Sequence, residues 1–171
     1  MEADFDIRAL YRALDEARTN RELSWAQVAR EVNARFAEVA VRVVSASTIT
    51  GTRTRALVEA DGVLQMLRWL DRSPESFVPG HPLAAAAIAR LPGVEPNRIL
   101  RFDTKAMYDA LDRRRVERGL TWSGVAEEIG GIRAAGLTRL GEGGRTTFPQ
   151  VMRIVRWLER PAAAFTRASE W

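Results

Sequence analysis

Apolar and small residues recur at helical spacing in two similar stretches of the chain. In residues 23–32, Val28, Ala29 and Val32 fall on one face of a helix. Residues 120–129 repeat this pattern. Each stretch carries a serine or threonine that can cap a helix, and its central alanine lets a second helix cross closely. The pattern predicts the first helix of a helix-turn-helix, present twice.

The similarity between the two stretches extends over most of the chain. Residues 5–32 and 102–129 are identical at 14 of 28 positions, at a spacing of 97. The match resumes at a spacing of 88, where residues 63–72 align with 151–160, and a phenylalanine ends the match in each copy. Self-similarity of this extent indicates an internal duplication.

Each copy is predicted to contain four helices and a final short turn. The expected ranges are 6–19, 24–32, 45–52 and 61–71 in the first copy, and 103–117, 121–129, 133–140 and 149–159 in the second. Asp6, Asp103 and Ser45 are the expected N-caps, and Gly130 and Gly131 suit a turn with positive φ. The predicted fold is therefore all-α, with two tandem four-to-five-helix domains at 1–78 and 102–171.

Two segments depart from the repeat. About ten residues, 33–42, are inserted in the first copy, and they predict either a lengthened second helix or a longer turn. Residues 79–101 separate the copies and hold an alanine-rich stretch, 83–90, between two proline-containing segments. We expect one short helix there, within a semi-rigid linker.

Composition narrows the chemistry of this 171-residue chain. It has no cysteine and one histidine, His81, so neither a thiolate or histidine metal site nor a Ser-His-Asp arrangement is expected in a domain. We predict that the protein is not an enzyme and has neither a cofactor nor a metal.

No apolar run approaches the length of about 20 residues that spans a bilayer. The acidic start, Met1 to Asp6, does not resemble a signal peptide. We therefore expect a cytoplasmic protein without a membrane partner.

The positive charge is concentrated in the second copy. Residues 1–90 hold 12 arginines and 12 acidic residues, whereas residues 91–171 hold 14 basic and 10 acidic residues. Lys105 is the only lysine among 26 basic residues. Arginine favours two-point contacts with phosphate and guanine, although a GC-rich coding bias would also produce arginine. Arginine usage by itself is therefore weak support for nucleic-acid binding.

Residues 44–50, Val-Ser-Ala-Ser-Thr-Ile-Thr, carry a resemblance to a known family. With the capped helix before them and the glycine turn at Gly130 in the second copy, they resemble the recognition segment of XRE-family (phage-repressor-like) regulators. The pairing of two arginine-rich domains is similar to an actinobacterial type of these regulators. The resemblance implies helix-turn-helix domains that bind DNA in a sequence-specific way and regulate transcription.

The matching positions give the candidate base-reading residues, because a recognition helix places its side chains against base edges in the major groove. We expect base contacts from Arg133, Ala135, Thr138 and Arg139 in the second copy and from Ala46, Ser47 and Thr50 in the first. Arg139 is the first choice, since a guanidinium can pair with O6 and N7 of guanine.

Candidate phosphate contacts flank these helices. They are Arg53 and Arg55 in the first copy, Arg145, Thr146 and Thr147 in the second, and the helix starts at Ser24, Trp25, Thr121 and Trp122. Backbone N–H groups at a helix start can bind a phosphate. For the two tryptophan rings, packing against a neighbouring helix is the expected alternative.

The predicted function is a transcriptional regulator that binds double-stranded DNA through two unequal half-sites and is associated with the nucleoid. The alternative is a protein-interaction adaptor in which one or both copies keep the fold but bind a protein. The first copy would then bind a partner or form a homodimer. Its balanced charge, its insertion and the few long polar side chains on the recognition helices favour this alternative.

Overall fold

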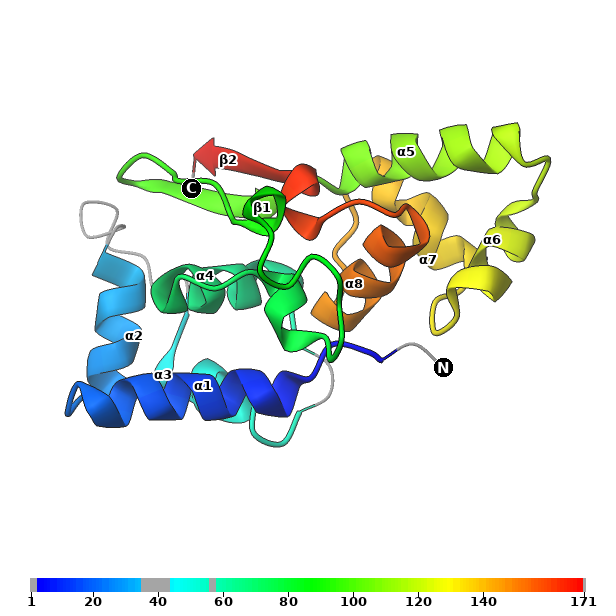
Figure 1. Ribbon diagram of the computed structural model, residues 1–171. Helices are drawn as coiled ribbons and strands as arrows, with labels where there is room; N and C mark the ends of the chain where they lie inside the picture. Colours follow the sequence, from blue (N-terminus) through cyan, green and yellow to red (C-terminus); the bar gives the residue numbers. More distant parts are fainter. Residues whose placement is uncertain (1–2, 35–43, 56–57, 171) are drawn as a thin grey trace.

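The computed structural model describes residues 3–34, 44–55 and 58–170, and the chain is mostly helical (Figure 1). Its helices are α1 (Ile7–Asn20), α2 (Trp25–Asn33), α3 (Ala46–Gly51), α4 (Ala60–Leu70), α5 (Thr104–Glu117), α6 (Trp122–Ile129), α7 (Ala134–Arg139) and α8 (Phe148–Trp157). Short 3₁₀ turns occur at Pro74–Phe77, Ala87–Ala89, Leu140–Glu142 and Ala162–Phe165. Strands β1 (Arg98–Phe102) and β2 (Thr166–Glu170) complete the described elements.

Side-chain caps start the helices at the predicted residues. The carboxylate of Asp6 accepts a hydrogen bond from the backbone of Ala9 at 2.9 Å, and Asp103 does the same at the start of α5. Ser24 caps α2 and Thr121 caps α6. These bonds satisfy backbone N–H groups that have no partner within a helix. The predicted helix starts are confirmed at each of these four positions.

The two copies differ after their second helices. α6 ends in a tight turn in which Gly130 and Gly131 have φ of 74° and 71°, a conformation that costs glycine little. α2 ends at Asn33, whose side chain bonds to the carbonyl and the N–H of Val44 at 2.6 and 3.0 Å. Residues 35–43, most of the predicted insertion, lie outside the described residues. Asn33 thus holds together the two ends of that segment.

Two predictions of the fold class need correction. β1 and β2 form an antiparallel pair, with Arg98 opposite Glu170 and Phe102 opposite Thr166, so the chain is mainly α rather than all-α. The alanine-rich residues 83–90 form one 3₁₀ turn at Ala87–Ala89 instead of a helix. The alanine composition favours a helix, but the following Pro92 and the burial of Ala89 against the protein select an irregular path.

One hydrophobic cluster contains buried residues from both copies. It includes Leu10 and Leu67 from the first copy and Leu111 and Val151 from the second. Close packing of such side chains supplies most of the stability of a small protein. The two copies therefore share one core.

Backbone bonds at the centre of this core join equivalent residues of the two copies. The N–H of Ala60 donates to Thr146 at 3.2 Å, and the N–H of Phe148 donates to Val58 at 3.0 Å. Both pairs surround a bridge between Glu59 and Thr147, which are 88 positions apart. Each copy thus donates one of these backbone bonds to the other copy and accepts the equivalent bond from it, as in an isologous interface.

The segment before each copy's first helix packs on the last helix of the other copy. Ala3, before α1, accepts a hydrogen bond from Arg156 of α8 at 3.1 Å. Leu100, before α5, accepts one from Gln65 of α4 at 2.8 Å. As a result, β1 and β2 lie beside α4 although they flank the second copy in sequence (Figure 1). This exchange fixes the orientation of the two copies relative to each other.

Candidate nucleic-acid interface

Helix α3 presents a short polar surface to solvent. Ser45 caps it by accepting from the backbone of Thr48 at 3.1 Å, and Ile49 anchors its other side in the core with no exposed surface. Ser47 is exposed, whereas Ala46 and Thr50 are half-buried. The three predicted base-reading residues of the first copy therefore lie on one short helix, with Ser47 most open to solvent.

Helix α7 has the same construction in the second copy. Leu137 is buried and anchors the helix, while Ala135, Thr138 and Arg139 are exposed. Arg133 is the N-cap residue, but its side chain makes no capping bond. Both arginines of this helix therefore have side chains that are not needed to hold the helix in place.

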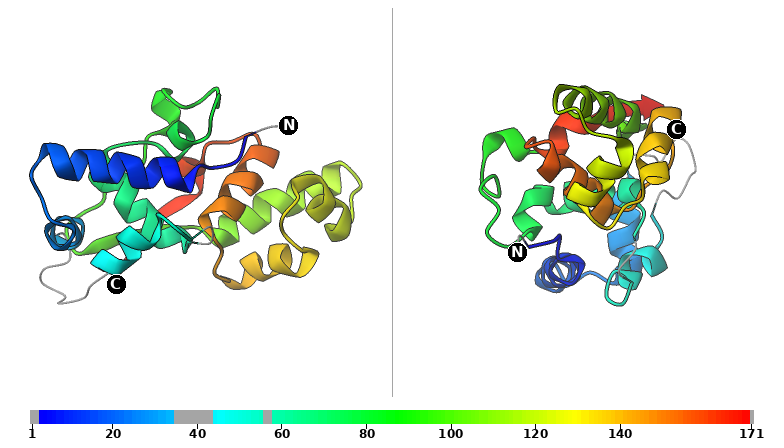
Figure 2. Two further views of the ribbon diagram at one scale, coloured as in Figure 1. Left: turned by 90° about the horizontal axis from the view of Figure 1, so that it is seen from below. Right: turned by 90° about the vertical axis from the view of Figure 1, so that its right-hand side faces the viewer.

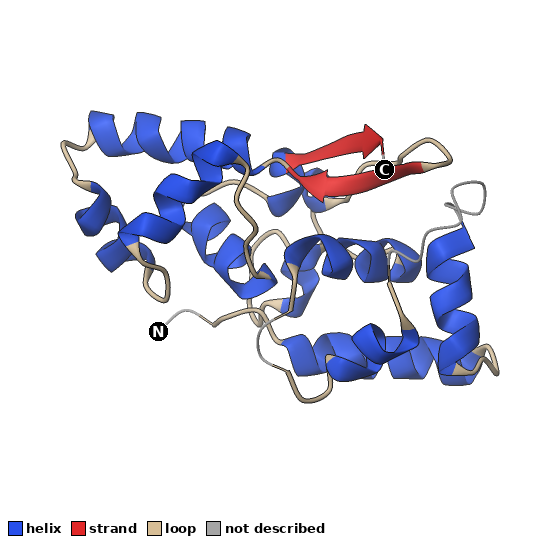
Figure 3. Cartoon of the chain, turned by 180° about the vertical axis from the view of Figure 1, so that it is seen from behind, coloured by secondary structure: helices blue, strands red, loops and turns tan. Residues whose placement is uncertain are grey.

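The two short helices lie on the same side of the molecule. Figure 3, seen from behind, shows α3 and α7 toward the viewer, and both lie along the lower edge of the left view in Figure 2. This placement is compatible with the reciprocal contacts at the Glu59 bridge, because a two-fold relationship keeps on one side those equivalent surfaces that face along its axis.

Several hydroxyl groups on this side already have hydrogen bonds within their own helices. The hydroxyl of Thr50 donates to the carbonyl of Ser47 at 3.4 Å, and that of Thr138 donates to Ala135 at 3.1 Å. The hydroxyls of Ser45 and Ser47 are 2.9 Å apart. A hydroxyl that donates to its own helix still has lone pairs and can accept from a base.

Five arginines near α3 and α7 are open to solvent, as is Arg113 of α5. Arg53, Arg55, Arg133, Arg139 and Arg145 are exposed, and among the described residues none of them has an ion pair with a carboxylate. Their guanidinium groups are free to meet an external anion, as far as the described part of the chain shows.

Two arginines of α5, Arg114 and Arg115, have carboxylate partners within the protein. Arg115 bonds to Asp112 at 2.7 Å, and Arg114 lies 3.3 Å from Glu159. These pairs keep the basic run of α5 within the protein's own charge network.

The tryptophans at the starts of α2 and α6 pack against the preceding helix. Trp25 stacks on Tyr11 with ring centroids 5.6 Å apart, and Trp122 stacks on Tyr108 at 5.2 Å. An arginine of the same preceding helix lies over each ring. The rings are therefore structural, and a phosphate at these helix starts would meet backbone N–H groups and the hydroxyl of Ser24 or its counterpart.

Thr146 and Thr147, two of the candidate phosphate contacts, lie partly buried where the two copies meet. The carbonyl of Thr146 accepts from Ala60, and its hydroxyl bonds to Gln150 at 3.1 Å. The hydroxyl oxygen of Thr147 is buried and has no hydrogen-bond partner among the described residues. These threonines are committed to the junction between the copies, which the sequence could not reveal because the junction joins residues far apart in the chain. Arg145 remains exposed beside them.

A residue that the sequence interpretation missed lies next to α7. Gln150 lines a shallow concavity with Gly131, Arg133 and Arg139, and its amide nitrogen lies 3.5 Å from the carbonyl of Gly131. Gln150 belongs to α8, whose apolar stripe indicates a core helix, so its sequence context gave no sign of a surface role. It adds an amide to the arginines around α7.

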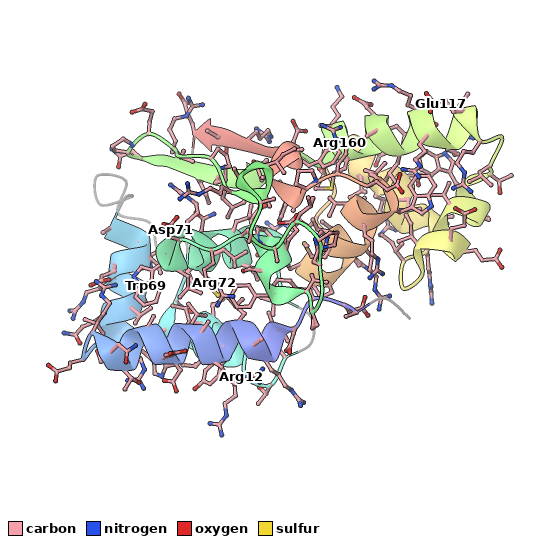
Figure 4. All side chains as sticks on the ribbon, in the orientation of Figure 1. Arg12, Trp69, Asp71, Arg72, Glu117 and Arg160 are labelled. Atoms are coloured by element: carbon pink, nitrogen blue, oxygen red, sulfur yellow. The ribbon has the colours of Figure 1, made fainter. Side chains whose placement is uncertain are left out.

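In each copy, a partly buried tryptophan links the last helix to the second helix by a hydrogen bond. In the first copy, Trp69 at the end of α4 donates to Glu31 of α2 at 2.8 Å, and Figure 4 labels Trp69 between these helices. Arg21 pairs with the same carboxylate at 2.8 Å. This three-residue set supports α2, against which α3 packs.

The second copy repeats the set with Trp157, Glu128 and Arg118. Trp157 donates to Glu128 at 2.8 Å, and Arg118 bonds to it at 2.6 Å. The hydrogen bonds from Arg118, and then from Trp157, hold the pKa of Glu128 below its usual value. The carboxylate therefore stays charged and holds α6, and with α6 the position of α7.

No family model matches the chain, and neither a curated protein nor a solved structure matches it. Among the described residues, no helix has the length and apolar character needed to cross a membrane, and no group of histidine and acidic side chains could hold a metal ion.

Proposed function

We propose that this protein is a transcriptional regulator that binds double-stranded DNA in a sequence-specific way. In this proposal the chain holds two helix-turn-helix domains, 1–78 and 102–171, of the XRE type. The pairs α2–α3 and α6–α7 would be the helix-turn-helix units, with α3 and α7 in the major groove. The domains would act as one body through their shared core.

The observation that carries the proposal is the placement of α3 and α7. Both are short helices anchored by one buried aliphatic residue, and both are exposed on the same side of the molecule. Neither helix contains an acidic residue. A duplex is an extended polyanion whose major groove faces one side of a protein at two successive turns. Two exposed helices without acidic residues on one side of the molecule suit such a partner.

Within this proposal the side chains have separate tasks. Arg139 can form two hydrogen bonds to guanine, a contact worth about 1–3 kcal/mol of discrimination. Methyl groups of Ala46 and Ala135 can contact thymine, whereas Ser47 and Thr50 accept or donate without strong preference. Arginines beside the helices would contact phosphates and set the register. The target would be two unequal half-sites, because α3 and α7 differ in sequence.

Selection of bound duplexes from a random pool tests the proposal. The full chain is required, because separate halves would expose the shared core. We expect the wild-type protein to enrich a site with two half-sites, and Arg139→Ala to relax the preference at one base pair. Arg113→Ala is the matched control, since Arg113 is exposed on α5, and it should enrich the wild-type site.

The adaptor alternative predicts no duplex binding, and a salt titration of duplex binding distinguishes it from the DNA proposal. Binding that neutralises phosphates weakens steeply as salt rises, because counterions are released from the duplex. A titration of labelled duplex at low and then increasing salt should show this dependence. Absence of duplex binding at low salt would contradict the DNA proposal and favour a protein partner.

A further inference from the structure

Two positions near the recognition helices carry the same two residue types in opposite order. In the first copy, residue 51 is glycine and residue 55 is arginine; at the equivalent positions of the second copy, residue 139 is arginine and residue 143 is glycine. Each copy thus has one arginine and one glycine, four residues apart. The number of guanidinium groups at these two positions is the same in both copies, although the residue at each position differs.

Arg55 folds back over the place that a side chain on Gly51 would occupy. An ideal Cβ on Gly51 would lie 3.5 Å from both Cζ and Nε of Arg55 and 3.6 Å from its Cδ. The backbone N–H of Arg55 also donates to the carbonyl of Gly51 at 2.9 Å. The guanidinium therefore lies on the surface of α3 at the position from which Arg139 projects on α7.

The glycine at position 51 leaves the surface beneath this guanidinium open. With no Cβ on residue 51, the guanidinium of Arg55 sits at van der Waals distance from where that atom would be, and a long side chain there would displace it. The second copy has the inverse arrangement, since Gly143 has φ of 78° and nothing within 4 Å of an added Cβ. Arg139 thus has no counterpart folding over it from residue 143.

We propose that Arg55 is a specificity-determining residue of the first copy, the counterpart of Arg139 in the second, and reads guanine in the first half-site. This inference rests on the proposed DNA-binding function. It replaces the sequence interpretation of Arg55 as a phosphate contact, because a guanidinium lying on the recognition helix faces the base edges that α3 would meet. Arg53 remains the candidate phosphate contact of this loop.

The inference changes what the target site should contain. Without Arg55, the first half-site would be read only by Ala46, Ser47 and Thr50, which discriminate weakly. With it, each half-site should contain one guanine under strong selection, at positions related by the two-fold relationship of the copies. The half-sites would then differ where Ser47 of α3 replaces Ala135 of α7, and where the second copy has Arg133 and the first copy has Ser45.

The test measures duplex affinity and base preference for three variants of the full chain. Arg55→Ala should reduce preference for guanine at one position of the first half-site by about 10–100-fold, the equivalent of a bidentate contact. Arg55→Lys keeps the charge but has no planar fork, so it should lose the same preference while keeping the salt dependence. Gly51→Arg combined with Arg55→Gly transfers the second copy's arrangement to α3 and should restore the guanine preference.

The outcomes separate the inference from the proposed function. If the wild-type chain selects no duplex, the DNA proposal itself fails. If it does select a site, but Arg55→Lys binds like wild type and Arg55→Ala weakens all sequences equally, then Arg55 contacts phosphate and the inference fails. Thermal melting of each variant identifies any that is unfolded, and Arg55→Lys keeps the test decisive because it removes no buried surface.

Discussion

Glu59 and Thr147 pair with each other in an antiparallel bridge, although they are the same position in the two copies of the repeat. The flanking bonds are also exchanged, from Ala60 to Thr146 and from Phe148 to Val58. Such reciprocal contacts are characteristic of a symmetric dimer interface, here formed within one chain. Because the bonds are between backbone atoms, they fix the separation of α3 and α7 without depending on side-chain identity.

A fixed separation predicts that the target half-sites have one allowed spacing. Inserting about 5 base pairs between them rotates one half-site by about half a turn of the duplex, which has about 10–10.5 base pairs per turn. The second recognition helix would then face the wrong side of the DNA. We expect affinity in a duplex-binding assay to fall to that of a single half-site.

Inserting a whole turn is the accompanying control. A flexible linker would reach a half-site displaced by about 34 Å, whereas two domains joined by one core would not. Recovery of full affinity with the longer insertion would contradict the rigid junction. Equal affinity for all spacings would indicate that only one copy binds DNA.

Phe148 is predicted to hold both copies together. Its ring is fully buried and lies 4.5 Å from Phe5 and 5.7 Å from Phe102, measured between centroids. Replacement of a buried phenylalanine by alanine costs about 3–5 kcal/mol. Phe148→Ala should therefore lower the free energy of unfolding of the whole chain by about this amount in urea denaturation, with circular dichroism and tryptophan fluorescence reporting one transition.

Val116→Ala gives the matched control for Phe148. Val116 is 62% exposed on α5, so its truncation should change the free energy of unfolding by less than about 0.5 kcal/mol. Two separate transitions in the Phe148 variant, or in the wild type, would mean that the copies unfold independently. The shared core would then contribute little to their association.

Local signals allowed the helices to be predicted from the sequence. Asp6, Ser24 and Thr121 cap helices because their short polar side chains reach backbone N–H groups within one turn. Leu137 and Ile49 are buried because each helix has one apolar side. These features depend on neighbours in sequence, so the sequence of this chain alone was enough to predict them.

The junction between the copies could not be predicted in this way. Its bonds join Ala60 to Thr146 and Gln65 to Leu100, and nothing in the local sequence of any of these residues indicates such a distant partner. β1 was missed for the same reason, since a single strand without its partner has no distinctive pattern. Thr147 was assigned to the candidate site because its burial arises only when the two copies pack together, and the local sequence does not show that packing.

Glu75 is predicted to make stability depend on pH. This buried side chain accepts a hydrogen bond from the backbone of Ala162 at 2.7 Å, and its other oxygen has no hydrogen-bond partner among the described residues. Burial raises the pKa of Glu75 above its usual value near 4.5. A raised pKa means that its contribution to stability is present below about pH 4.5 and is lost as pH rises through the folded-state pKa.

Glu75→Gln removes the charge and keeps an oxygen that can accept from Ala162. Its free energy of unfolding, relative to wild type, should therefore increase as pH rises from about 4.5 toward 8.

Glu128→Gln gives a contrast of opposite sign. Since hydrogen bonds from Arg118 lower the pKa of Glu128, that carboxylate stabilises the fold above the unfolded-state pKa, and the variant should lose stability relative to wild type as pH rises. Parallel curves for the two variants would contradict at least one of the two assignments.

Arg53 and Arg145 are predicted to contact phosphates. Both are exposed and lie in the loops that follow α3 and α7, and neither is placed over a recognition helix as Arg55 is. Loss of one phosphate contact reduces the slope of log affinity against log salt by about 0.9, without changing base preference. Each alanine variant should show this reduction in a salt titration with the selected duplex, and the double variant should show about twice the effect. Arg113→Ala, exposed on α5, should keep the wild-type slope; an equal reduction in that variant would mean that the slope reports overall charge rather than contact at α3 and α7.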